Sequence, residues 1–331
     1  MTATARDSAT VSAAPAAGRS VASAAGAALG TTAATTTPGA GASSATTLRM
    51  TKMHGAGNDY VYVDCRERDV ADPPRLARAV SRRHHGIGAD GLILVRPSAD
   101  ADVRMEMYNA DGSRAQMCGN GVRCVGKFVY ERGLHVNPMR IATDCGVKTL
   151  ELAVDARGRV SGATVDMGAP ILDGGRIPVA RDGRVIEQPL EVAGATWNVT
   201  CVSMGNPHCV VFLPEIESLD LARIGPTFEH HAFFPERVNT EFVAARARHE
   251  VDFRVWERGS GETMACGTGA CAAVVAGVLT DRTDRRVLVH LRGGDLEIEW
   301  RADDHVYMTG AAAEIFTADV ELATLYAATG V

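Results

Sequence analysis

The sequence has no apolar run approaching the ~20 residues that a membrane-spanning helix requires. Its 34 Lys and Arg are outnumbered by 40 Asp and Glu, and the arginines are scattered along the chain, which argues against a nucleic-acid partner. It also lacks the apolar segment of a signal peptide, and eight cysteines in 331 residues are too dilute for the disulfide framework of a small secreted domain. We therefore expect a soluble, cytoplasmic protein with reduced thiols.

Residues 1–47 differ in kind from the rest of the chain. They are rich in Ala, Thr, Ser and Gly, with Arg6, Asp7 and Arg19 as the only charges, and such a segment cannot bury a core. We predict that 1–47 is a disordered extension. Plastid targeting is a second, weaker interpretation of the same composition.

Two stretches of the chain are nearly alike. Cys118 begins Cys-Gly-Asn-Gly and Cys266, 148 residues later, begins Cys-Gly-Thr-Gly. A repeat of this length is too long for a solenoid and favours two similar domains related by a pseudo-twofold axis. The same offset relates Asn58 to Asn206, Asn109 to Glu257, and Gly91 to Asn239.

The hydrophobic pattern predicts short strands around one long helix in each half, an α+β (mixed α/β) fold. The predicted helices are 76–83, 119–131 and 267–278. The predicted strands are 60–63, 92–95, 103–108, 140–143, 148–154, 159–167, 199–204, 209–212, 241–245, 252–256, 287–291, 296–300 and 305–308. The resulting domains are an N-terminal lobe of 48–164 with about 317–331, and a C-terminal lobe of 165–316.

Each Cys-Gly-x-Gly places a thiol beside the unpaired N–H groups at a helix start, where anions are stabilised. We expect this position to lower the pKa of both thiols. The glycines would let a substrate carboxylate approach the same N–H groups. One thiolate facing one thiol can exchange a proton across a carbon, whereas two carboxylates would both be deprotonated at neutral pH. A single cysteine here would be read as a small buried hydrophobe, which is our interpretation of Cys124 and Cys271.

Two other site types are less well supported by the pattern. The string from Gly86 to Gly91 matches Gly-x-Gly-x-x-Gly, but a strand follows it where a dinucleotide fingerprint needs a helix. A redox or ligand-binding protein with a regulatory disulfide between the paired cysteines would leave the repeated asparagines unexplained.

From Leu48 to near its C-terminus, the chain resembles the diaminopimelate epimerase family. The resemblance implies a cofactor-independent, PLP-independent isomerase without a metal, which interconverts LL- and meso-2,6-diaminoheptanedioate in lysine and peptidoglycan precursor synthesis and forms a homodimer. It also implies two lobes, each a mixed sheet wrapped around a central helix, with the active site in the cleft between them. The segments that carry it are 52–59, 108–113, 117–124, 204–209, 238–242 and 257–269.

By this resemblance, Cys266 is the proton acceptor for the LL-isomer, Cys118 is the proton donor, and His208 and Glu257 adjust the protonation of the thiols. Some family members carry Gln where this chain has Gly91, so we expect that contact to be absent or replaced by water. The implied substrate-binding residues are Asn58, Asn109, Gly119, Asn120, Asn206, Asn239, Glu257, Arg258, Gly267 and Thr268.

The alternative is a proline or hydroxyproline racemase or epimerase of the same architecture. Those enzymes typically have His at the position of Asn120. The asparagine there, and the other asparagines of the set, favour an acyclic substrate with two amino-carboxylate ends, because amides supply donors and acceptors without adding charge.

Overall fold

The computed structural model describes residues 46–331, so the expectations of disorder and plastid targeting for the first 45 residues lie outside it. Thr47, which we assigned to the extension, already begins the first strand. In the described part, 18 strands join in one continuous sheet.

The strands fall into two runs that repeat one pairing order. The first run is β1 (Thr47–Gly55), β2 (Asn58–Asp64), β3 (Gly91–Arg96), β4 (Val103–Asn109), β6 (Met139–Thr143), β7 (Gly146–Val154) and β8 (Val160–Gly168). The second is β10 (Ala195–Ser203), β11 (Pro207–Phe212), β12 (Asn239–Ala247), β13 (Glu250–Glu257), β15 (Arg286–Leu291), β16 (Gly294–Trp300) and β17 (Val306–Ala311). Antiparallel pairing of β8 with β17 joins the two runs.

The strand registers repeat with the offset found in the sequence. The parallel pair of Tyr60 and Gly91 recurs as His208 and Asn239, 148 residues on. The antiparallel pair of Leu92 and Tyr108 recurs as Thr240 and Trp256, and that of Met139 and Leu150 as Val287 and Ile298. The prediction of two similar mixed α/β lobes is therefore confirmed, whereas their limits at about 164 and 317 stay a prediction.

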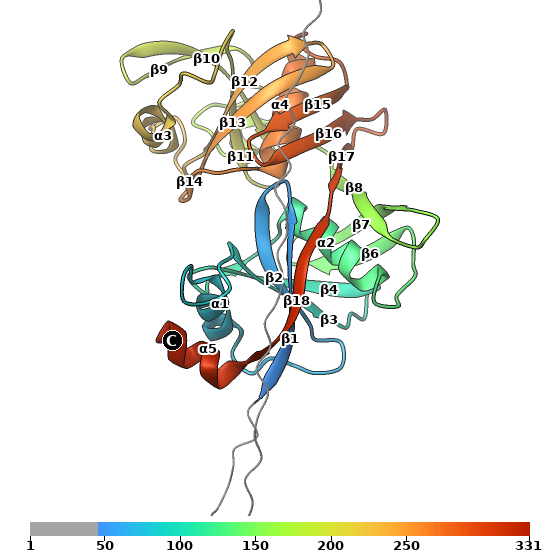
Figure 1. The fold of residues 1–331 in the computed structure, drawn as a ribbon. Coiled ribbons are helices and arrows are strands. Elements are labelled where there is room, and N and C mark those ends of the chain that lie inside the picture. Colours follow the sequence, from blue (N-terminus) through green and yellow to red (C-terminus); the bar gives the residue numbers. More distant parts are fainter. Residues whose placement is uncertain (1–45) are drawn as a thin grey trace, which may run out of the picture. The chain divides into compact units, whose positions relative to one another are not determined.

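Each lobe holds one long helix against its sheet, α2 (Gly119–Tyr130) in the first and α4 (Gly267–Leu279) in the second. Helix α2 packs against β8 and β1, and α4 against β16 and β10 (Figure 1). Because α4 is almost entirely Ala, Val and Gly, it can be buried on every side, and ten of its residues are. Wrapping a sheet around such a helix leaves its first turn, with the free N–H groups, at the end of the lobe.

Several elements differ from the sequence-based prediction. The helix predicted at 76–83 is α1 (Pro73–Ser81), capped by Asp72, because prolines are tolerated in the first helical turn. The pattern missed β1, which carries polar residues among its apolar ones. Also missed were β9 (Gln188–Val192) on β10, β18 (Ala313–Glu321) on β1, helices α3 (Leu221–Glu229) and α5 (Leu322–Thr329), the 3₁₀ turn Gly174–Arg176, and the two-residue strands β5 (Arg114–Ala115) and β14 (Gly261–Glu262).

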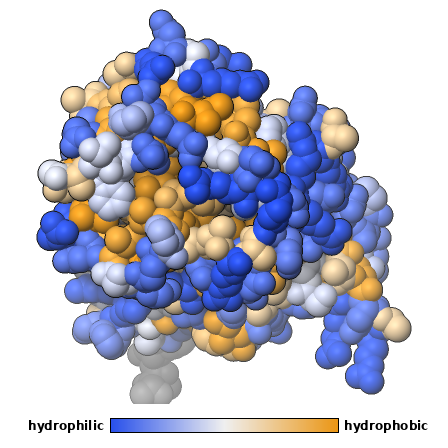
Figure 2. All heavy atoms as spheres, turned by 90° about the horizontal axis from the view of Figure 1, so that it is seen from above, coloured by the Kyte–Doolittle hydropathy of each residue, from blue (hydrophilic) through white to orange (hydrophobic). Residues whose placement is uncertain are grey.

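The face of the molecule seen from above is mixed in polarity (Figure 2). Seen from above, polar residues form most of the outline, and apolar side chains gather in patches between them (Figure 2). Exposed large apolar residues include Met264, Ile315 and Phe316. Within residues 46–331, no helix is both long and apolar enough to span a bilayer.

Candidate active site

The first half-site is built on the start of α2. Cys118 is the N-cap residue, in extended conformation, and its Sγ accepts a hydrogen bond from the Gly121 N–H at 3.4 Å. The thiol donates to Asn58 Oδ1 at 3.1 Å, and the Asn58 amide donates to Asp90 Oδ2 at 2.7 Å. The strand–turn–helix context predicted from the sequence thus places Cys118 beside the turn between β1 and β2.

The second half of the site has the same backbone conformation at the start of its helix, but its cysteine is more deeply buried. Cys266 is the N-cap of α4, also extended, but only 5% of the residue is exposed. Its Sγ lies 3.6 Å from Thr268 Oγ1. A methyl group added at Gly269 would lie 3.2 Å from this sulfur, so glycine is what lets the thiol sit over the helix start.

The two helix starts converge on one methionine of β17. A methyl group added at Gly119 would lie 2.6 Å from Met308 Cε, and one at Gly267 would lie 3.0 Å from Met308 Sδ. The Asn120 Oδ1 atom lies 3.8 Å from the same added carbon at Gly267. The structure therefore brings the first turns of α2 and α4 together, although they are 148 residues apart.

The remaining first-lobe candidates lie at strand ends near Cys118. Asn109 ends β4 opposite Gly91 and donates to Ser113 Oγ at 3.0 Å. A methyl group at Gly91 would lie 2.8 Å from Cε1 of Tyr60 and 2.1 Å from the Tyr108 carbonyl oxygen. The backbone here leaves no room for a Cβ, and our expectation of a contact absent or replaced by water at Gly91 stays a prediction.

The second-lobe candidates form two neighbouring hydrogen-bonded groups, one around His208 and one around Asn239. His208 is fully buried, with Nδ1 2.7 Å from Glu241 Oε1 and Nε2 3.0 Å from Asn206 Oδ1. Asn239 donates to the Pro207 carbonyl at 2.8 Å and accepts from the Arg258 N–H at 2.9 Å. These residues come from the ends of β11, β12 and β13, which are adjacent in the sheet.

Glu257 ends β13 and accepts a hydrogen bond from Thr263 Oγ1. Burial raises the pKa of its carboxyl, and hydrogen bonds from Thr263 and Cys266 act in the opposite direction. Its charge also acts on Cys118. Glu257 is therefore near both thiols. The Arg258 side chain instead donates to the Glu236 carbonyl at 3.0 Å.

The expectation of lowered thiol pKa values is wrong for this structure. Burial raises the pKa of Cys118, and the N–H groups of Gly121 and Asn120 offset this only in part. Burial raises the pKa of Cys266 well above its usual value, and the charges of Glu257 and Glu241 raise it further. Desolvation outweighs the helix start because a thiolate at either position has lost most of its water, whereas the helix supplies only a few donors.

Sequence reasoning assigned no role to Glu241. Glu241 is fully buried, and its Oε1 is hydrogen-bonded to His208. Its other oxygen, Oε2, has no hydrogen-bond partner among the described residues. The signal was available, because Glu241 is the one acid in a run of residues predicted to form a buried strand. A carboxylate is rarely buried unless paired.

The fold of the chain is shared with proteins of very different sequence. The chain superposes on a hydroxyproline epimerase from Agrobacterium vitis with a TM-score of 0.60, over 83% of this chain and 93% of that one, at 12% sequence identity. Identity this low establishes a shared fold and nothing about substrate. The chain thus has the two-lobed fold found in amino-acid epimerases.

Sequence similarity is far more specific. The diaminopimelate epimerase family model matches residues 50–172 and 200–315. A diaminopimelate epimerase from Desulfovibrio desulfuricans is 53% identical over 284 residues, covering 83% of this chain and 99% of that protein. One from Agathobacter rectalis is 51% identical over 285 residues, covering 83% of this chain and all of its own length. The chain belongs to the diaminopimelate epimerase family.

Proposed function

We propose that this protein epimerises LL-2,6-diaminoheptanedioate to the meso isomer by a two-base exchange that uses no cofactor. The observation that carries the proposal is the convergence of two Cys-Gly-x-Gly helix starts on Met308. Family membership and the identity of over 50% to curated epimerases along their whole length support the substrate.

In the proposed reaction, the Cys266 thiolate takes the α-hydrogen of the LL-isomer as a proton. The electron pair left behind spreads into the α-carboxylate, and the Cys118 thiol returns a proton to the opposite face. The N–H groups of Gly119 and Asn120, and of Gly267 and Thr268, would bind that carboxylate as its charge grows. The cysteines exchange protonation states, and the reverse reaction begins from the other thiolate.

The raised thiol pKa values fit this scheme once the substrate is considered. An α-ammonium group beside a thiol favours the thiolate, and it arrives with the substrate. The free enzyme would then keep its thiols protonated, and substrate binding would create the base. Glu257 and His208, hydrogen-bonded to Cys266 and to Asn206 respectively, are the groups we assign to this adjustment.

Substrate selection is assigned to the amides and one arginine. Asn58, Asn206 and Asn239 lie at strand ends around the thiols, and Arg258 carries the charge that would bind the distal carboxylate in a bidentate manner. Asn109 completes this set on the first lobe. Asparagines suit a doubly zwitterionic ligand because they do not alter the charge near the thiols.

The test is deuterium incorporation at the α-carbon of LL-diaminopimelate in D₂O. Wild type should incorporate deuterium and form the meso isomer, while Cys118→Ala and Cys266→Ala should each abolish turnover; Cys124→Ala is the matched control. Full epimerisation by either active-site variant contradicts the two-base mechanism. The same assay with D- and L-proline tests the rival substrate.

We also propose that the enzyme is a cytoplasmic homodimer. Among the described strands, β18 pairs only with β1, which leaves its outer edge open, and Ile315 and Phe316 on it are exposed. An open apolar edge strand is a natural contact for a second copy. Sedimentation of wild type and Phe316→Glu tests this, because a monomeric wild type would refute it.

A further inference from the structure

Helix α2 carries a buried cation close to its first turn. Arg123 is fully buried and has no carboxylate partner in the part of the chain that the structure describes. Its guanidinium donates to Asn120 Oδ1 at 2.9 Å, the Gly119 carbonyl at 3.3 Å, Met308 Sδ at 3.5 Å and the Ala311 carbonyl at 3.5 Å. A buried charge without a counter-charge is costly, so its retention calls for a functional explanation.

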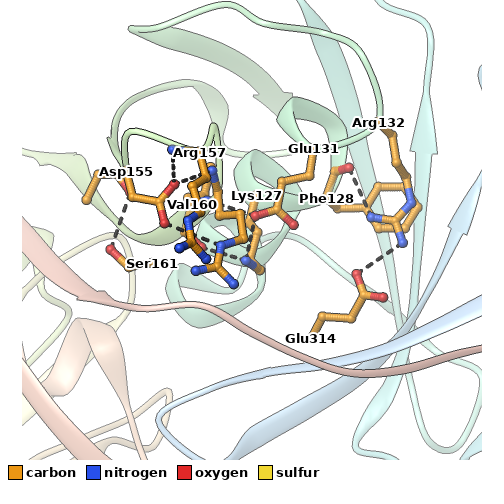
Figure 3. A network of polar contacts seen from close by, with 11 residues as sticks. Lys127, Phe128, Glu131, Arg132, Asp155, Arg157, Val160, Ser161 and Glu314 are labelled. Carbon is orange, nitrogen blue, oxygen red and sulfur yellow. Dashed lines mark hydrogen bonds and ion pairs between the residues drawn. The ribbon is translucent and has the colours of Figure 1, made fainter.

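The cations at the other end of the same helix are different (Figure 3). Lys127 lies 2.7 Å from Glu131, and Arg132 lies 3.1 Å from Glu314 while it stacks on the Phe128 ring. Those charges are partly exposed and paired. Among the described residues, the lack of a carboxylate partner is therefore specific to Arg123, which lies beside the Cys118 thiol, and does not extend to the other cations of α2.

The contacts of Arg123 link both helix starts. Arg123 donates hydrogen bonds to Asn120 and Gly119, which begin α2. It also contacts Met308, against which Gly267 of α4 packs. A methyl group added at Gly310 would lie 3.0 Å from the guanidinium carbon, so glycine makes room for the side chain on β17. Arg123 thus fixes the carboxylate-binding N–H groups of one helix against the other.

The groups that face the two thiols are asymmetric in charge. Two charges act on Cys118, the cation Arg123 of its own helix and the carboxylate Glu257 of β13. Tyr60 and Tyr62 of β2 lie beside it. The groups acting on Cys266 are Glu257, Glu241 and the hydroxyl of Thr268. The remaining titratable neighbours of Arg123 are Cys124 and Cys271.

We propose that Arg123 is a positioning residue that holds Asn120 at the junction of the two helices, and that its buried charge beside the start of α2 makes a thiolate form more readily at Cys118 than at Cys266. The charge stabilises a Cys118 thiolate, and the planar fork fixes the Asn120 amide. This inference rests on the proposed two-thiol function. It predicts that both thiols of the free enzyme are protonated at neutral pH and that, as the pH is raised, Cys118 ionises at a lower pH than Cys266.

The test is the pH dependence of iodoacetamide labelling of Cys118, followed by peptide mass spectrometry. In Arg123→Met, the midpoint should rise by about one pH unit, the lower end of the effect of a neighbouring charge. Arg123→Lys, which keeps the charge and loses the fork, should keep the midpoint within a few tenths of a unit but raise KM. Arg132→Met is the matched control at the far end of α2 and should change neither quantity. An unchanged midpoint in a folded Arg123→Met, shown by its circular dichroism, overturns the proposal.

Wild type offers a test that no folding defect can obscure. The labelling midpoint of Cys118 should lie below that of Cys266, and midpoints are compared because the two sulfurs differ in accessibility. The reverse order overturns the proposal even if the enzyme epimerises diaminopimelate. Conversely, the expected order in a protein without epimerase activity would refute the proposed function and leave the role of Arg123 intact.

Discussion

The two helix starts have the same backbone and different surroundings. Both begin with an extended cysteine N-cap, and both pack their first glycine on Met308. The residues around them, however, have diverged in charge while keeping the 148-residue register. Asn109 corresponds to Glu257, Tyr60 to His208, Ile93 to Glu241, and Arg123 to Cys271.

The first half therefore carries the buried cation, and the second carries the carboxylates and the imidazole. The proposed two-base exchange requires one thiol to be deprotonated while the other still carries its proton. Perfect symmetry would leave that distribution to chance, whereas opposite charges around the two thiols set it. The repeated helix start thus provides the geometry of the site, and the different neighbours of the two cysteines provide its asymmetry.

The largest expected effect comes from replacing Glu257 with asparagine, the residue at the equivalent position 109 of the first lobe. Glu257→Asn removes the carboxylate whose charge acts most strongly on Cys266, so kcat should fall by at least about 10²-fold, the lower limit for loss of an acid–base group. The labelling midpoint of Cys266 should fall as well, because a negative neighbour has been removed. Asn109→Gln is the control on the other lobe and should affect KM more than the midpoint. A kcat within threefold of wild type would show that the difference in charge is incidental.

Next in size is the buried pair that only the second lobe has. Glu241→Ala leaves Nδ1 of the buried His208 without its hydrogen-bond partner, and an unsatisfied buried polar group should cost about 1–3 kcal/mol of unfolding free energy. The double variant His208→Tyr with Glu241→Ile copies the first lobe, where Tyr60 and Ile93 are both buried, and should be more stable than Glu241→Ala while remaining inactive. Urea denaturation measures the stabilities. If the double variant were no more stable than the single one, the two sites would not be structurally equivalent.

The sequence predicted what depends on local pattern and repetition. The offset from Cys118 to Cys266 predicted two equivalent lobes, and strand registers such as Tyr60 with Gly91 and His208 with Asn239 repeat it. Strands with apolar runs, such as β3 and β11, were found. The edge strand β18, whose exposed and half-exposed residues give no buried face, was not found.

The sequence predicted that the residues of the candidate site lie near the two helix starts, but it did not predict their electrostatics. A helix start lowers the pKa of a thiol when water still surrounds that thiol. Both cysteines are buried instead, so the predicted direction was wrong for both thiol pKa values. Burial depends on tertiary packing that no local window contains. For the same reason Arg123 and Glu241 escaped notice, since burial and tertiary contacts, which no local window shows, give each of them its importance.

A smaller effect should separate the first glycines of the two helices. A methyl group at Gly119 would lie 2.6 Å from Met308 Cε and one at Gly267 would lie 3.0 Å from its Sδ, so both overpack the junction, Gly119→Ala more severely. We expect losses of about 1–3 kcal/mol, within the range for overpacking. Combining Gly119→Ala with Met308→Ala should recover part of the loss by removing the clash. Thermal denaturation gives the order, and a larger loss for Gly267→Ala would contradict the contact geometry of the junction.

The smallest effect concerns a cysteine inside each helix. Burial raises the pKa of Cys124 to about 11 and that of Cys271 to about 12, so both stay protonated in the folded state when they would ionise in the unfolded chain. Their contribution to stability is complete below pH 9 and is lost as the pH rises toward these folded-state values. Each thiol should therefore steepen the fall in unfolding free energy by about 1.4 kcal/mol per pH unit above pH 9. Urea midpoints at pH 8, 9.5 and 10.5 should show a shallower fall for Cys124→Ala and for Cys271→Ala. The exposed Cys145→Ala should follow wild type, since that thiol meets water in both states. Equal slopes in all four proteins would mean that the interiors of the two helices are wetter than their packing indicates, and the desolvation argument for Cys118 and Cys266 would weaken with it.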